Sequence, residues 1–113
     1  MIKVEAGDWV LIRKSQTGLN GLLLHGSRVA RVRMVEPGAI ISVFEKPKDK
    51  IWLNTDPQSH GCGVDWIEHK LTELEVEQYK AFCAEARDLT NRIQAYFGGD
   101  MKFVDPQEFE VKS

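Results

Sequence analysis

The feature that most constrains the fold is one long amphipathic segment at residues 73–97, placed after a region of short strand-like runs. Thr72-Glu73-Leu74-Glu75 has the pattern of a capping box, in which the first and last side chains each accept a backbone N–H of the other. Gly98-Gly99 has the composition common just beyond a helix C-terminus. Between these signals, apolar residues recur at spacings of three and four, the period of one helix face: Tyr79, Phe82, Ala86, Leu89, Ile93 and Tyr96. We therefore expect one helix from Glu73 to Phe97.

Residues 1–70 predict short strands instead. The clearest is 28–35, in which Ala30 and Val32 alternate with Arg31 and Arg33. Glu36-Pro37-Gly38 has the composition of a type II turn, which would fold 28–35 back on 39–46 as a hairpin. The expected strands are 8–14, 28–35, 39–46, 51–53 and 64–70, with loops at 15–27 and 54–63 and a basic turn at 46–50.

Five short strands within 70 residues avoid exposed edges by curling into a small barrel. A chain of 113 residues is long enough for one hydrophobic core and too short for two. The sequence thus predicts a single α+β domain. Residues 1–70 form a five-stranded antiparallel barrel, 71–99 a helix packed on that barrel, and 100–113 an acidic tail.

Charge and hydropathy exclude several classes of protein. The formal net charge is −2, which excludes a strongly basic chain, yet residues 1–50 carry nine Lys and Arg against five Asp and Glu. Residues 51–113 reverse the balance, with six against twelve. No apolar run approaches the roughly 18 residues of a membrane span. The N-terminus has no apolar signal-peptide core, so we expect a cytoplasmic protein without a membrane partner.

A basic hairpin is the main candidate binding site. Arg31 and Arg33 are expected to project from one face of their strand, and guanidinium groups bind phosphate or carboxylate in a bidentate manner. Trp52 either stacks on single-stranded bases or fills the core. The pattern is compatible with a nucleic acid and with a protein partner. The full candidate set is Arg28, Arg31, Arg33, Lys46, Lys48, Lys50 and Trp52.

Metal binding and catalysis have weaker sequence support. His60, Cys62, His69 and Cys83 supply zinc-type ligands, but the His60-Gly-Cys62 spacing is tighter than usual and Cys83 lies on the apolar helix stripe. A nucleophilic site could be built from Cys62 with the nearby His60 and Asp65, but no further signal in the sequence supports one. We therefore predict no cofactor, no metal and no catalytic residue.

The strand region resembles SH3-like barrels of the KOW and Tudor type. The resemblance rests on Gly7-Asp8-Trp9-Val10-Leu11-Ile12, a long loop, Arg28-Val29-Ala30-Arg31-Val32, a Pro-Gly turn and Ile40-Ile41-Ser42-Val43-Phe44. It covers residues 7–70 and implies a small barrel. It implies no function, because such barrels serve many.

A narrower resemblance is to MazF-type ribonuclease toxins, which are SH3-like barrels of this length with a C-terminal helix. Gly7-Asp8 and the later Gly26-Ser27-Arg28-Val29 follow the order of that family's motifs, although Val29 replaces the family's proline. The resemblance implies a role for Arg28 in RNA cleavage. Thr55 is the nearest candidate for the hydroxyl residue that accompanies this arginine.

These observations lead to a functional expectation. We expect a non-enzymatic interaction module, acting as an adaptor, regulator or inhibitor, that binds nucleic acid or protein through the basic hairpin. The alternatives are a MazF-like endoribonuclease and a structural assembly protein. The apolar stripe of the helix either packs over the barrel or forms a homodimer seam through residues 73–97.

Overall fold

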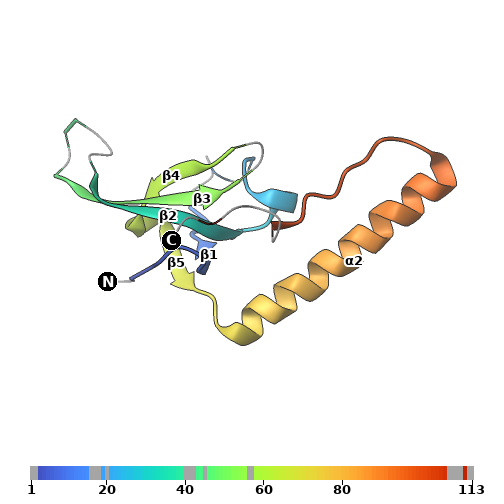
Figure 1. Ribbon diagram of the computed structural model, residues 1–113, viewed down its shortest axis with the longest axis horizontal. Helices are drawn as coiled ribbons and strands as arrows, with labels where there is room; N and C mark the ends of the chain where they lie inside the picture. Colours follow the sequence, from blue (N-terminus) through green and yellow to red (C-terminus); the bar gives the residue numbers. More distant parts are fainter. Residues whose placement is uncertain are drawn as a thin grey trace.

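The computed structural model describes residues 3–15, 19, 21–39, 43–44, 46–55, 58–106 and 111. Its strands are β1 (Trp9–Ile12), β2 (Val29–Ala39), β3 (Lys48–Asn54), β4 (His60–Gly63) and β5 (Ile67–Lys70). Two 3-10 turns, η1 (Leu24–Gly26) and η2 (Val64–Trp66), precede β2 and β5, and the helix α2 (Glu73–Phe97) follows the sheet (Figure 1).

The five strands form one antiparallel sheet in the order β4-β3-β2-β1-β5. Val10 pairs with Ala30, and Val32 pairs with Leu53, which fixes the register across the three central strands. In the part of the chain that the structure describes, no ladder joins β4 to β5. The predicted α+β class, five antiparallel strands and a long helix are confirmed, and hydrogen bonds do not close the sheet into a barrel.

The predicted turn at Glu36-Pro37-Gly38 is wrong, because β2 continues through it to Ala39. The pairing of β2 with β3 is irregular between Glu36 and Ala39. Proline has no N–H for the ladder and is tolerated at such irregularities. Gly38 adopts φ of 64° there, a left-handed conformation that glycine reaches without strain. Pro37 and Gly38 therefore mark an irregularity within a strand and do not reverse the chain.

Three further boundaries differ from the prediction. The hairpin partner of β2 is β3 and not 39–46; residues 40–42 and 45 of that expected strand lie outside the described residues. The expected loop 54–63 contains β4, whose two glycines hid its strand character. The expected strand 64–70 begins as the 3-10 turn η2 before β5 starts at Ile67.

The core lies on the inner face of the sheet. Alternation along β2 and β3 sends Val32, Ile51 and Leu53 inward, where each is at most 1% exposed. Residues of the preceding segments, Leu19 and Leu23, cover this face and belong to the same cluster. The core is completed by Val4, Val10, Ile12, Ala30, Cys62 and Ile67.

Helix α2 has the predicted bounds and the predicted capping box, with Thr72 accepting from the N–H of Glu75 at 3.2 Å. It extends well beyond the sheet, so the molecule measures 53 × 29 × 27 Å (Figure 1). The following segment, 98–106, runs back beside the helix and reaches η1, where Phe103 stacks on His25 at 4.3 Å. Among the described residues, no helix is long and apolar enough to cross a membrane.

Candidate binding face on strands β2 and β3

The outer face of β2 and β3 carries the polar cluster that we call the donor face, defined as Arg31, Lys50, Trp52 and Asn54. The alternation that buries Ile51 and Leu53 in the core turns these four side chains to the opposite side. Arg31 and Asn54 are direct cross-strand partners. Trp52 and Lys50 continue along the same face of β3 at two-residue intervals.

Three N–H donors of this face have no acceptor. Among the described residues, Arg31 Nε, Trp52 Nε1 and Asn54 Nδ2 are buried atoms without a hydrogen-bond partner. Asn54 as a whole is only 5% exposed. A buried donor left unsatisfied destabilises a protein by about 1–3 kcal/mol. Three neighbouring unsatisfied donors therefore destabilise the isolated chain. Because these atoms are buried, an acceptor from outside the chain would remove this destabilisation only if the side chains over them move aside on binding.

Lys50 adds a cation to the donor face. Its ammonium nitrogen lies 4.3 Å from the centroid of the Trp52 ring, within cation–π range. The lysine side chain can lie there because β4 has a glycine at the neighbouring position: a Cβ on Gly61 would clash with Lys50 Cε. Gly61 therefore leaves the space through which the lysine stem reaches the indole.

The tryptophan rings are not open stacking surfaces. Trp9 is 8% exposed, between the Arg31 guanidinium at 5.5 Å and the Tyr79 ring at 5.7 Å. Trp66 packs against the core and stacks on His60 at 6.4 Å. The Trp52 ring has Lys50 over it. Each indole thus has a neighbour where a nucleic-acid base would stack.

The structure divides the predicted basic set. Arg28 lies just before β2, where its Nε donates to the Ile12 carbonyl at 2.9 Å and its terminal nitrogen lies 3.0 Å from Glu68. At about 3.3 Å per residue, the 11-residue β2 separates Arg28 from the Lys48 end of the hairpin by some 36 Å. These contacts give Arg28 a structural role at the β1–β5 end of the sheet.

Lys48 lies on the same face of β3, two residues before Lys50, and its ammonium lies 3.5 Å from Asp65. Lys46 is exposed before β3 begins. Arg33 lies at the register irregularity between Val32 and Met34. Of the seven predicted site residues, the structure therefore brings together Arg31, Lys50 and Trp52, with Lys48 one step further along the same face of β3.

Sequence reasoning missed Asn54. The strand was expected to end at Leu53, which assigned Asn54 to a loop, whereas β3 includes it. The available signal was the period of two in Lys50-Ile51-Trp52-Leu53-Asn54, which continues the outward series of polar and aromatic residues by one step.

The cysteine and histidine candidates do not converge. Cys62 is 2% exposed in the core, and burial, followed by the nearby Asp65 carboxylate, raises the pKa of its thiol to about 12. A thiol with this pKa is protonated at neutral pH and is a poor nucleophile or metal ligand. His60 and His69 lie on β4 and β5, the two edges of the sheet. The described residues contain no group of three or more His, Cys, Asp or Glu suited to a metal ion.

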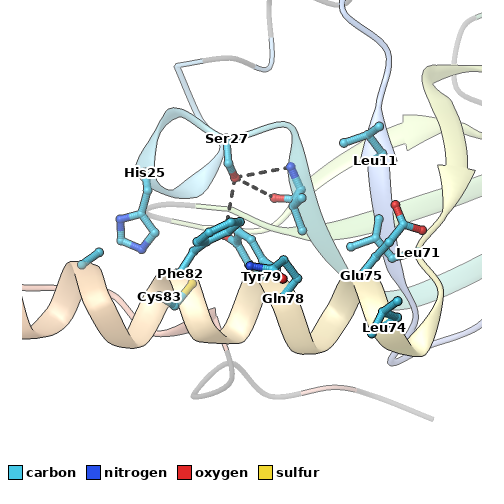
Figure 2. Close-up of a pocket in the computed structure, with 12 residues that line it drawn as sticks. Leu11, His25, Ser27, Leu71, Leu74, Glu75, Gln78, Tyr79, Phe82 and Cys83 are labelled. Atoms are coloured by element: carbon cyan, nitrogen blue, oxygen red, sulfur yellow. Dashed lines mark hydrogen bonds between the residues drawn. The ribbon is translucent and has the colours of Figure 1, made fainter.

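A groove lies between α2 and the sheet (Figure 2). This groove has a volume of about 620 Å³ and a mainly apolar lining that includes Leu11, Val29 and Leu71 from the sheet side. Tyr79 spans it, with its hydroxyl 3.4 Å from Ser27 Oγ, and burial raises the pKa of that hydroxyl to about 12. Polar side chains also line the groove: His25, Ser27, Glu75, Gln78 and Tyr79.

Comparison with known proteins gives no family for this chain. No protein-family model matches it, and neither the curated proteins nor the solved structures contain a significant match.

Proposed function

We propose that this chain is a non-enzymatic interaction module whose donor face binds an acidic segment of a protein partner. The observation that carries the proposal is the cluster of three unpartnered donors on Arg31, Trp52 and Asn54. An ionised carboxylate offers only acceptors, which is the complement of such a cluster. Lys50 beside the indole contributes positive charge to the same face.

A protein partner is favoured over nucleic acid by the state of the aromatic side chains. Non-specific single-strand binders rely on free aromatic rings along a basic groove. Here Trp9 is buried, and the Lys50 ammonium lies over one face of the half-buried Trp52 ring. The formal net charge of −2 also lacks the positive footprint of most nucleic-acid-binding domains.

The fold supports a binding role by analogy only. The strand order β4-β3-β2-β1-β5, with a 3-10 turn between β4 and β5, is similar to that of SH3-like barrels. We propose that the sheet is an open member of that architecture. Because such barrels serve many functions, the analogy adds no partner.

Among the described residues, the contacts of Arg28 and Thr55 do not favour the ribonuclease alternative. Arg28 is engaged by Ile12 and Glu68, and the hydroxyl of the buried Thr55 donates to the Gln58 carbonyl. Both residues therefore serve the chain's own structure. RNA cleavage remains a measurable outcome of the experiment below.

The test is an NMR titration that observes the donors directly. Proton–nitrogen spectra resolve the Trp52 indole N–H, the Asn54 side-chain amide and the Arg31 Nε–H. We expect a glutamate-rich peptide to shift these three signals, because each N–H gains an acceptor. The Trp66 indole, packed on the core, serves as the internal control and should stay in place.

Two variants and one competing ligand make the titration decisive. Arg31→Met should weaken peptide binding roughly tenfold or more, since a hydrogen bond to a charged group is worth about 1.5–3 kcal/mol. Arg13→Met, at an exposed arginine outside the donor face, should leave binding unchanged. If single-stranded RNA shifts these three signals and the peptide does not, the partner is a nucleic acid and not a protein. Cleaved RNA would support the toxin alternative, and three unmoved donor signals would refute the donor face.

A further inference from the structure

We propose that two copies of this chain pair antiparallel through the exposed apolar side of α2. We define the helix seam as Phe82, Ala86, Leu89, Ile93 and Tyr96. Its members recur at spacings of four, three, four and three, the seam pattern of a coiled coil. Large side chains of this seam are left uncovered by their own chain: Phe82 is 55% exposed, Leu89 51% and Tyr96 86%.

Among the described residues, Phe82 and Ala86 of the seam also line the groove that faces the sheet, whereas Leu89, Ile93 and Tyr96 lie outside it. Tyr79 and the buried Cys83 occupy the side of the helix that faces η1 and the sheet. Arg87 pairs with Asp105, and Gln94 donates to the Met101 carbonyl, so the segment 98–106 binds that same helix beside the seam. An isolated helix projecting into solvent rarely carries such large exposed apolar groups without a partner.

Charge complementarity selects a second copy in antiparallel orientation. Glu85 and Arg92 lie seven residues apart, each directly before a seam position. With the twofold axis at Leu89, Glu85 of one copy faces Arg92 of the other. The symmetry creates a second, equivalent pair between Arg92 of the first copy and Glu85 of the second. In this register Phe82 meets Tyr96 of the second copy, and Leu89 meets its own equivalent. Flanking charges of this kind set partner and orientation in paired helices.

The shape of the molecule permits this orientation. The sheet lies beside the first half of α2, and the second half projects beyond it (Figure 1). Antiparallel pairing of the projecting halves sends the two sheets to opposite ends, whereas parallel pairing would place both sheets at the same end.

The available area is below that of a typical stable dimer. The four large side chains of the seam, Phe82, Leu89, Ile93 and Tyr96, together expose about 450 Å², taking roughly 200 Å² for each. Two copies would thus bury about 900 Å², whereas specific interfaces bury about 1,200–2,000 Å² in total. We therefore expect a dimer that dissociates on dilution.

Sedimentation equilibrium of the full chain across micromolar concentrations tests the proposal. The intact chain should show a reversible monomer–dimer equilibrium. Leu89→Glu should raise the dissociation constant more than about tenfold, because it places charges in the centre of the seam. Ala84→Glu adds the same charge at an exposed position on the opposite side of the helix and should leave the dimer intact. A monomer at every concentration overturns the proposal, as does a dimer that Leu89→Glu leaves unchanged.

A charge exchange tests the register. Arg92→Glu alone sets like charges against Glu85 of the second copy and should weaken the dimer. The double variant Glu85→Arg with Arg92→Glu restores opposite charges and should recover it. Circular dichroism controls for helix content, because Arg92 also pairs with Asp88 at 3.3 Å within the helix. If the double variant forms a weaker dimer than Arg92→Glu alone, the antiparallel register is overturned. The donor face contains none of these residues, so the outcome is independent of the proposed function.

Discussion

The most informative single substitution is Trp52→Phe. It removes the unpartnered Nε1–H and keeps a ring on which Lys50 can lie. Truncating a tryptophan ordinarily destabilises a protein. Here we expect the free energy of unfolding to remain unchanged or to increase, because the variant removes a buried donor that the native chain leaves unsatisfied.

The magnitude follows from two opposing contributions. Losing the unsatisfied donor gains about 1–3 kcal/mol. Replacing a half-buried indole with phenyl gives up about 50 Å² of buried apolar area, which costs roughly 1 kcal/mol at about 25 cal/mol per Å². The net change is a gain of about 0–2 kcal/mol, or up to about 8 °C in Tm for a domain of this size. Urea unfolding followed by circular dichroism measures it.

Trp66→Phe is the matched control. Its ring packs against the core, and its indole nitrogen is not among the buried unpartnered atoms of the described residues. Removing that nitrogen therefore brings no compensating gain, and we expect a loss of about 1 kcal/mol. An equal loss in Trp52→Phe would show that the Trp52 N–H already has a favourable partner, such as an ordered water. The reasoning behind the donor face would then fail.

Three further predictions concern the helix start and the core cysteine. Thr72→Ala should cost about 1 kcal/mol in urea unfolding, because the Glu75 N–H loses its capping acceptor. The backbone N–H of Thr72, and then His69, lower the pKa of Glu75 from its ordinary 4.5. The stabilisation by Glu75 is therefore complete above pH 4.5 and is lost as the pH falls through the lower folded value, so Glu75→Gln should flatten the acid side of the Tm profile. A thiol reagent should leave Cys62 unlabelled in the folded chain at neutral pH and label it in urea, and equal rates in both would contradict its burial.

The helix could be predicted closely because its signals are local. The capping box, the apolar period and Gly98-Gly99 lie within or next to the element that they define. Strand ends were less predictable, since they depend on pairing with distant residues. Pro37 and Gly38 are compatible with either a turn or a strand irregularity, and the β2–β3 register decides between the two.

The site was predictable only in part, for a related reason. The alternation of residues indicates which side chains leave the core, and it correctly placed Arg31 outside. Whether an outward polar group finds an acceptor depends on neighbours across the strands. Asn54 lacks an acceptor beside Arg31, its cross-strand partner on β2, and Lys50 reaches the Trp52 ring across Gly61 on β4. No pattern within one strand contains that information.

The two proposals together have a consequence that neither has alone. Antiparallel pairing through the helix seam would place one donor face at each end of the dimer, separated by at least the helix length of about 37 Å. A partner with two suitably spaced acidic segments would then engage both faces, and such bivalency raises apparent affinity by about 10²–10⁴ without new contacts. Leu89→Glu should therefore weaken the binding of a two-segment ligand and leave that of a single segment unchanged. Arg31→Met should weaken both, because it acts at each donor face itself.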